Sequence, residues 1–339
     1  MTLTTLDQVW AGLQAPRDFS KVATPTLVAG RPHSLFYLGG TPGAGSAPSA
    51  GLKGAAMAAA LAGCLPYTNA SSGETKLTAL EAQMTGAGGE ILLCDRLWAN
   101  SGVVLTSGTN NLVGNPIVSS SVANPTVITC TGNVPFANSD VVYICGHSGG
   151  SPGIPDGEYT ISNVSGATFT IPINMSSGGS GGSVGIPMAA RDDNGAKLGA
   201  GVQMALEVSG AMGANTPTCA VVYTNNAGVV NKTAAMLDAA VASAAVGAFH
   251  RLSLAAGDSG VRTVQTLTFG GTAWASGTIH LVMYRVLARL PLTAANVPSV
   301  KDPLQLGAKM YDGSDLFVVV IPAATTASII SGNAQWAQG

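Results

Sequence analysis

This sequence of 339 residues has little charge. Lys, Arg, Asp and Glu make up 9% of it, against about a quarter of an ordinary soluble chain. Exposed helix faces need such side chains, so a long helical or coiled-coil protein is excluded. Charge-driven disorder is excluded too, because 46% of the residues are hydrophobic. The 15 basic and 17 acidic residues give a net charge of −2, so we expect no nucleic-acid partner.

Long hydrophobic runs are missing as well. The longest apolar stretch, Ala55 to Leu65, is mostly alanine and reaches about half of the roughly 20 residues that a membrane-spanning helix needs. The first residues carry Asp7 where a secretory signal would be basic, and no apolar segment follows. We therefore expect no contact with a membrane and synthesis in a cytosol.

Metal-ligating side chains are few and scattered. The five cysteines are odd in number with no C-x-x-C pair, and we interpret them as buried free thiols. The four histidines show no metal-site spacing. The segment Asp192-Asp193-Asn194-Gly195 resembles a calcium loop in composition, but it lacks the spacing and the distal glutamate, and it predicts a tight turn. We expect neither a metal nor a cofactor.

What the sequence has in abundance is Gly, Ser, Thr and Asn between short apolar stretches that alternate with period two. This pattern predicts an all-β protein whose main part is a jelly-roll-like β-sandwich. In Thr78 to Met84 a helix is also conceivable, and we choose a strand because the apolar residues alternate with Glu81 and Gln83. The strands predicted for the main part are Ser34–Leu38, Thr78–Met84, Glu90–Trp98, Val202–Val208, Cys219–Tyr223, Phe249–Leu254, Val261–Phe269, Thr278–Leu287, Asp315–Ile321 and Ala327–Trp336. The Ala-rich stretch after the Gly39–Gly54 connector predicts a short helix.

The N-terminus predicts the one clear helix. Thr5 and Gln8 have the spacing of a capping box, and Pro16 ends the segment. Apolar residues at positions i, i+3, i+4 and i+7 form one stripe. They are Leu6, Val9, Trp10 and Leu13. The stripe either packs on its own domain or docks on a neighbouring subunit, and these four are the candidate inter-subunit residues.

The distribution of charge divides the chain. Between Arg96 and Arg191 there is no Lys or Arg at all. We predict that residues 114–186 form a small β-barrel inserted into a host domain of residues 1–113 and 187–339. Four strands are expected in the insertion, and they are Pro125–Thr131, Asp140–Cys145, Gly157–Val164 and Thr168–Ile173. Its closing Gly/Ser segment, Met175 to Gly185, predicts a flexible linker.

Two motifs suggest catalysis and neither has its required context. Gly146-His147-Ser148-Gly149-Gly150 matches the nucleophile elbow of hydrolases, but Pro152 and Pro155 forbid the helix that must follow it. Gly257-Asp258-Ser259-Gly260 matches a serine-protease loop, but Val261 stands where a glycine is needed. A turn between strands explains both motifs. We therefore assign no catalytic residue and expect a protein that is not an enzyme.

Residues 127–172 resemble a small β-barrel module of many tailed-phage structural proteins. The matching elements are Ser139–Val142, Asp156–Ile161 and Thr168–Ile171, whereas Pro135-Phe136 replaces the usual His-Gly. The host segments resemble a class of phage virion proteins. These segments are Leu92–Trp98, Tyr223–Gly228, Ala256–Arg262 and Ala337–Gly339.

This resemblance implies a structural protein of a tailed-bacteriophage virion, synthesised and assembled in the cytoplasm of the bacterial host. It implies a decoration or cement protein on the head that contacts the major capsid protein or other virion proteins. We expect a homo-oligomer, with a trimer favoured. The alternatives are a neck or tail protein, and a carbohydrate-binding module for the host surface in which exposed Trp98, Trp274 or Trp336 would stack on sugars.

Overall fold

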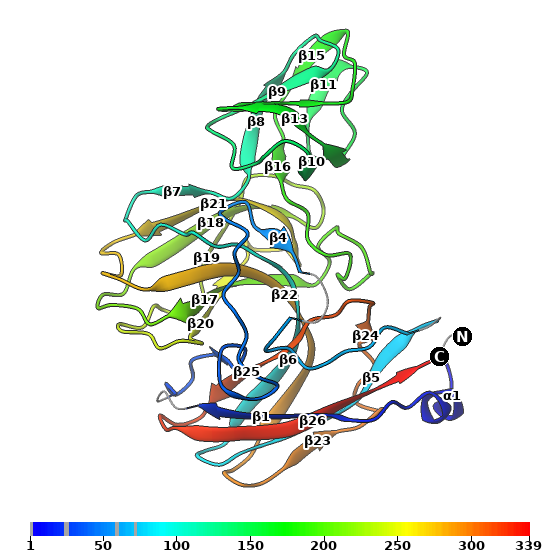
Figure 1. The fold of residues 1–339 in the computed structure, drawn as a ribbon, viewed down its shortest axis with the longest axis vertical. Helices are drawn as coiled ribbons and strands as arrows, with labels where there is room; N and C mark the ends of the chain where they lie inside the picture. The colour runs from blue at the N-terminus through cyan, green and yellow to red at the C-terminus, as the bar shows by residue number, and fades with distance from the viewer. Residues whose placement is uncertain (1–2, 24–26, 58–60, 71–72) are drawn as a thin grey trace.

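The computed structural model describes residues 3–23, 27–57, 61–70 and 73–339. The described residues form many strands and one short helix, α1 (Leu6–Ala11). This confirms the predicted all-β, sandwich-like fold class. The strands form three sheets stacked along the long axis of the molecule, and α1 lies beside the C-terminus at the level of the bottom sheet (Figure 1). Within the described part, no helix is long and apolar enough to cross a membrane.

The bottom sheet has the strand order β23-β5-β26-β1-β3, with β24 also paired to β5. Its strands are β1 (Arg17–Ala23), β3 (Gly40–Thr41), β5 (Thr75–Met84), β23 (Ser299–Lys301), β24 (Lys309–Met310) and β26 (Ser328–Gln338). In β5, buried Leu80, Ala82 and Met84 alternate with exposed Glu81 and Gln83. This confirms that the segment is a strand, with one face in the core.

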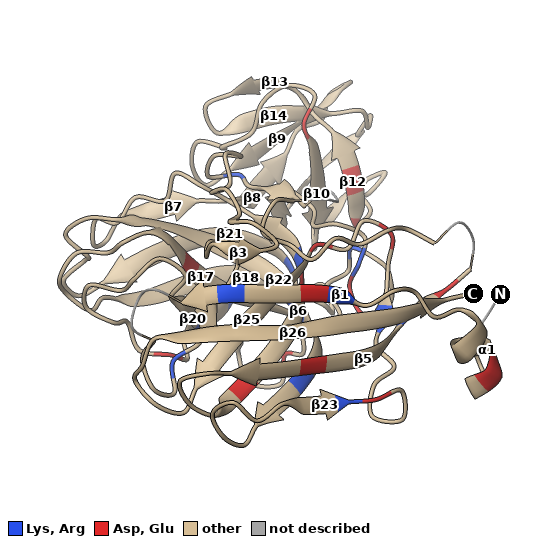
Figure 2. Cartoon of the chain, turned by 60° about the horizontal axis from the view of Figure 1, so that its bottom comes forward, with Lys and Arg blue, Asp and Glu red and all other residues tan. Residues whose placement is uncertain are grey.

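The middle sheet has the order β2-β25-β6-β22-β17-β20-β19-β18-β21-β7, with β4 also paired to β6. Its strands are β2 (His33–Ser34), β4 (Ala55–Ala56), β6 (Gly89–Ala99), β7 (Asn110–Leu112), β17 (Val202–Gly210), β18 (Thr218–Asn225), β19 (Lys232–Met236), β20 (Phe249–Ser253), β21 (Val261–Gly270), β22 (Thr278–Leu292) and β25 (Leu316–Pro322). At one end of this sheet, Ile91 and Val318 share a core with Trp336 of the bottom sheet, which makes a sandwich. The other end encloses a second core that contains Leu206 and Phe269. Charged residues are scattered thinly over both sheets (Figure 2).

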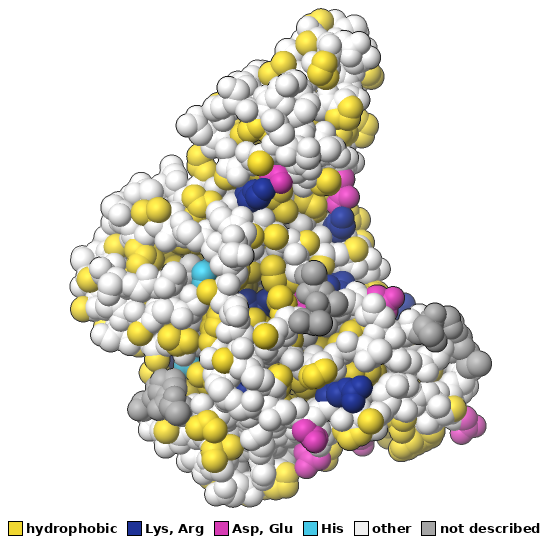
Figure 3. Space-filling model, viewed as in Figure 1, with side chains coloured by type: hydrophobic (Ala, Val, Ile, Leu, Met, Phe, Trp, Pro, Cys, Tyr) yellow, Lys and Arg dark blue, Asp and Glu magenta, His cyan; other side chains and the backbone are white. Residues whose placement is uncertain are grey.

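The strands between residues 115 and 185 pair with one another in the upper sheet, in the order β12-β10-β16-β8-β9-β14-β13, with β15 joining β11 to β8. They are β8 (Asn115–Ser120), β9 (Thr126–Cys130), β10 (Val141–Cys145), β11 (Ser148–Ser151), β12 (Gly157–Thr160), β13 (Ser162–Ser165), β14 (Thr168–Ile171), β15 (Ser177–Ser180) and β16 (Ser183–Gly185). Ile128, Val142 and Phe169 are fully buried in their common core. This part projects from the body, and its visible surface carries almost no charged side chain above its base (Figure 3).

The upper sheet joins the middle sheet through two adjacent strands. The chain enters the upper sheet through β8 and leaves it through β16. These two strands pair antiparallel, with Asn115 opposite Val184. The amide of Gly114 donates a hydrogen bond of 2.9 Å to the carbonyl of Gln265 in β21. A Cβ on Gly114 would lie 2.3 Å from the carbonyl oxygen of Val184, so only glycine fits at this entry. Both ends of the segment therefore lie side by side, as an insertion into a loop requires.

Three local predictions were wrong. The Gly/Ser segment predicted as a flexible linker contains β15 and β16, because β15 pairs with the equally Gly/Ser-rich β11 through backbone hydrogen bonds that need no side chain. The strand predicted over Ser34–Leu38 is limited to β2, which ends at Ser34 before a turn. The predicted Ala-rich helix is instead the short strand β4 at its start, and residues 58–60 lie outside the described residues.

Candidate functional site

Helix α1 carries the candidate docking residues and has the expected cap. The amide of Gln8 donates to Oγ1 of Thr5 at 3.3 Å, and the amide of Thr5 donates to Oε1 of Gln8 at 3.1 Å. No residue of the helix is buried. Leu6 is 52% exposed and Trp10 is 62% exposed, whereas Val9 is half-buried. One edge of the apolar stripe therefore faces solvent in the single chain.

The exposed stripe continues onto a neighbouring loop. Leu6 and Val9 line a pocket of about 230 Å³ together with Pro303 and Leu306. The adjacent Leu304 is 80% exposed. Leu13 lies beyond the end of the helix, is half-buried and pairs through its backbone with β26. We give the name α1 patch to the exposed Leu6, Trp10 and Leu304 together with the half-buried Pro303.

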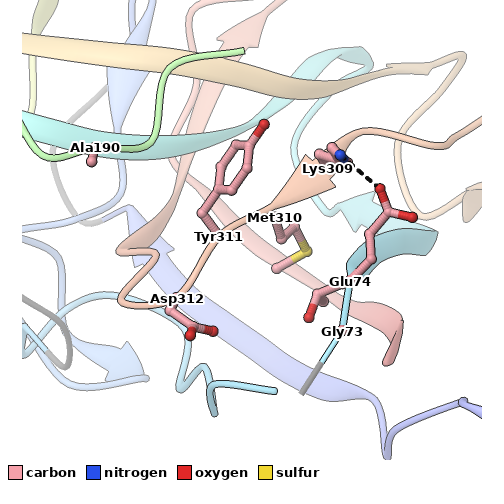
Figure 4. A pocket seen from close by; sticks show the side chains of 8 residues that line it. Gly73, Glu74, Ala190, Lys309, Met310, Tyr311 and Asp312 are labelled. Atoms are coloured by element: carbon pink, nitrogen blue, oxygen red, sulfur yellow. Dashed lines mark ion pairs between the residues drawn. The ribbon is translucent and has the colours of Figure 1, made fainter. Parts of the chain in front are cut away.

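A second pocket, of about 350 Å³, lies between the start of β5 and strand β24 (Figure 4). Its wall holds an ion pair in which Nζ of Lys309 lies 2.9 Å from Oε1 of Glu74. Burial acts to raise the pKa of Glu74, but the hydrogen bond and charge of Lys309 and the charge of Lys76 outweigh it and hold this pKa below its usual value. Glu74 in turn raises the pKa of Lys309. Both groups stay charged near pH 7, so the pair is poorly suited to acid–base catalysis.

The elbow-like motif lies between two strands of the upper sheet. Strand β10 ends at Cys145, and Ser148 begins β11, where its Oγ donates to the carbonyl of Ser180 at 3.2 Å. The intervening His147 is half-buried, and burial lowers its pKa. The local structure is the strand, turn and strand that the prolines predicted.

The other two motifs are structural turns. Tyr223 Oη and Asn225 Nδ2 donate to the carboxylate of Asp258 at 2.6 and 2.7 Å, which fastens the turn before β21 to strand β18. Asp192 accepts backbone amides at 2.8–3.2 Å. The donors are Asn194, Ala196, Gly199 and Ala200. In the described ranges, no group of three or more His, Cys, Asp or Glu side chains is arranged to hold a metal ion.

The tryptophans considered for sugar binding lie in the core. Trp98, Trp274 and Trp336 are at most 3% exposed, so none of them can stack on a sugar ring as the chain stands. Trp10 is the exposed tryptophan. All five cysteines are free and buried, which confirms their interpretation as core thiols.

The feature that the sequence reasoning missed is a set of buried charges. Arg96 of β6 and Glu207 of β17 form an ion pair in which Nη2 lies 2.7 and 2.6 Å from the two carboxylate oxygens. Their side chains are 1% and 0% exposed. The guanidinium lies between the rings of Phe36 and Phe317, at 4.2 and 4.8 Å from their centroids. Its Nε and Nη1 have no hydrogen-bond acceptor, so Glu207 is the one negative partner bonded to this buried cation among the described residues.

Asp95 lies at the centre of a second buried cluster. Nη2 of Arg191 lies 3.3 Å from the carboxylate of Asp95 and 3.4 Å from that of Asp315. Arg285 lies 3.6 Å from Asp95, and Ser314 Oγ donates to it at 3.0 Å. Burial raises the pKa of Asp315 to about 6. The cluster joins strands β6 and β22, the turn before β25 and the 187–200 loop, which is a structural role. Charged residues inside apolar strands were the available signal.

Comparison with known proteins does not assign the chain to a family. No protein-family model matches the chain, and no curated protein matches it. A T=1 particle derived from infectious bursal virus aligns at 9% identity over 96% of this chain and 79% of the other, with a TM-score of 0.16. The VP2 subviral particle of infectious bursal disease virus aligns at 10% identity over 97% and 82% of the two chains, with a TM-score of 0.15. Similarity at this level carries no argument about fold or function.

Proposed function

We propose that the chain is a non-enzymatic structural subunit of a virion, without a cofactor. The resemblance of residues 127–172 and of the host segments to tailed-phage structural proteins supports this role. The finer proposal is a decoration or cement protein on the head of a tailed phage, held by contacts with the major capsid protein or other virion proteins. The same resemblance would also suit a neck or tail subunit.

The observation that carries the proposal is where the charges lie. The chain has 32 charged residues, and ten of them are buried, which leaves 22 for an accessible surface of 12508 Å². The ten are Lys21, Asp95, Arg96, Arg191, Asp192, Glu207, Asp238, Arg262, Arg285 and Asp315. Like charges are what keep soluble monomers apart, and a surface this neutral favours association. This scarcity of surface charge supports a subunit that packs against others.

The α1 patch supports association between copies. An exposed indole, Trp10, lies on the same short helix as the Leu6 and Val9 side chains that line the open pocket of about 230 Å³. One surface thus carries both an apolar knob and a hole. We place Trp10 of one copy against this pocket of a second copy, as the main anchor of a homo-oligomer. A trimer is our favoured stoichiometry.

The suspected catalytic serine supports the non-enzymatic part. Ser148 Oγ donates to the Ser180 carbonyl within its own sheet, so its hydroxyl is part of a strand contact. Asp258 of the other motif is bonded to Tyr223 and Asn225. Ester hydrolysis by the purified chain that is abolished by Ser148→Ala would overturn this part.

Purified particles of the virus that encodes the chain test the virion role. Quantitative mass spectrometry should find the chain at a fixed, high copy number relative to the major capsid protein. Density for the all-β subunit on the outer face of the head would support decoration, and density at the neck or tail would support the alternative. Absence of the chain from intact particles would overturn the proposal.

The oligomer is tested separately with the purified full chain. We expect Trp10→Ser to weaken self-association by about 30-fold, because a tryptophan anchor contributes about 2 kcal/mol or more. The control is Leu237→Ser, which removes an apolar side chain of similar exposure, 58%, from a loop of the middle sheet. Sedimentation velocity measures both. A native chain that stays monomeric at micromolar concentration, or equal effects of the two substitutions, would contradict the docking surface.

A further inference from the structure

The upper part of the molecule, residues 114–186, is called the module here, and all of its charges face the host. It contains three charged residues, Asp140, Asp156 and Glu158, and no Lys or Arg. Each of the three pairs with a cation from outside the module. The pairs are Lys53–Asp140, Arg262–Asp156 and Lys197–Glu158. Acidic and basic side chains accordingly lie next to one another at the base of the projecting part (Figure 3).

The three carboxylates share one edge of the module. Asp140 precedes β10, and Asp156 and Glu158 lie at the start of β12, which pairs with β10 as the last strand of that edge. The connection to the host runs through β8 and β16, further along the same sheet. The ion pairs therefore lie to one side of a neck of two strands.

The host cations come from separate segments. Lys53 belongs to the connector before β4, Lys197 to the loop before β17, and Arg262 to β21. The Lys53 Nζ lies 2.7 Å from Asp140, with both side chains mostly buried. Arg262 lies 3.5 Å from Asp156 and also donates to the carbonyl of Asn226 at 2.7 Å. The pairs thus bind the module to three different points of the host.

A buried thiol, that of Cys145, lies at the contact between the module and the host. Cys145 lies at the end of β10, and its Sγ donates to Asp156 at 2.9 Å. On the host side the same sulfur is 3.4 Å from the carbonyl of Gly228 and 3.4 Å from Nη1 of Arg262. Cys145 is fully buried, and burial raises its pKa to about 12. Moving the module away from the host would uncover this sulfur and leave the module core closed.

We propose that the three ion pairs form an electrostatic clamp that holds the module at one angle on the host, and that opening the clamp exposes Cys145. Neutral side chains line the rest of the module surface, so the module has no other charge with which to hold its position. Salt weakens partly exposed ion pairs, and the clamp should therefore loosen as ionic strength rises. The angle between the module and the host should therefore depend on ionic strength.

The test measures alkylation of Cys145 by iodoacetamide in the full chain, located by mass spectrometry. Asp140→Asn with Glu158→Gln removes two pairs without touching the thiol. We expect Cys145 to react about tenfold faster, because the two lost ion pairs together stabilise the closed state by about that factor. Cys130, in the module core, should keep its native rate.

Matched controls separate the clamp from other effects. Asp18→Asn with Glu81→Gln makes the same change of charge on the bottom sheet and should leave the Cys145 rate unchanged. Lys53→Gln with Lys197→Gln removes the same two pairs from the host side and should reproduce the acceleration. An unchanged Cys145 rate in both junction variants would overturn the proposal. Equal acceleration of Cys130 would do so too, because it would mean that the module unfolds.

Discussion

The buried pair of Arg96 and Glu207 gives the sharpest prediction about stability. Glu207→Gln leaves a guanidinium that is 1% exposed with one neutral acceptor, while its Nε and Nη1 already lack partners. Removing one partner of a buried pair costs about 3–5 kcal/mol. For a chain of 339 residues, that loss lowers the midpoint of thermal unfolding by roughly 4–7 °C.

Urea unfolding at pH 7 measures the change in the free energy of unfolding directly. The control is Glu90→Gln, because Glu90 and Arg289 form an Arg–Glu pair between β6 and β22 that is partly exposed, at 3.5 Å. That substitution should cost less than about 1 kcal/mol. The double variant Arg96→Met with Glu207→Met should recover most of the loss, since an apolar pair of similar volume avoids the burial of charge.

Two results would refute this reasoning. Equal losses for Glu207→Gln and Glu90→Gln would mean that burial does not decide the cost. Additive losses in the double variant would mean that the two side chains contribute separately, through packing against Phe36 and Phe317, and not as a pair.

The other predictions concern a buried acid and a tight glycine. The pKa of Asp315 is raised from 3.8 to about 6, so between these pH values the folded chain keeps a proton that the unfolded chain has lost. This group should therefore lower the free energy of unfolding by about 2 kcal/mol between pH 4 and pH 7. Asp315→Asn should lack that decline, and parallel pH profiles of the two chains would contradict it. Gly54→Ala should cost at least about 2 kcal/mol in urea unfolding, because its φ is +68° and a Cβ would lie 2.0 Å from the ring of Trp98. Gly51→Ala, with a φ of +72° and open space, should cost clearly less.

The sequence could predict what depends on local pattern. The capping box and the stripe of α1 involve neighbouring residues, and the alternation in β5 is visible in seven consecutive residues. Strands β11 and β15 were missed because their Gly/Ser sequences contain no apolar alternation. They form strands because their backbones pair with each other. This pairing depends on how the whole chain folds, and neither segment shows it in its own sequence.

The partners of the buried charges and the contacts of the junction could not be predicted, for the same reason. Arg96 and Glu207 are 111 residues apart, and Lys53 and Asp140 are 87 apart. Residues so far apart in the sequence form no local motif from which the pairs could be predicted. The sequence did show that residues 114–186 contain no Lys or Arg. Any ion pair of their three carboxylates therefore needs a cation from another part of the chain. The location of those partners required the folded chain.

The distribution of charge leads to one last prediction, in which salt separates the two proposed contacts. The α1 patch is apolar, so association through Trp10 should persist or strengthen as salt is added. The clamp consists of ion pairs, and at about 1 M salt the Debye length falls to about 3 Å, which screens the partly exposed pairs of Lys53 and Lys197. Raising the salt should therefore accelerate alkylation of Cys145 while the sedimentation coefficient of the oligomer stays constant. Dissociation of the oligomer in step with the exposure of Cys145 would mean that the same ion pairs support both contacts, and the separate roles assigned to the α1 patch and the clamp would be wrong.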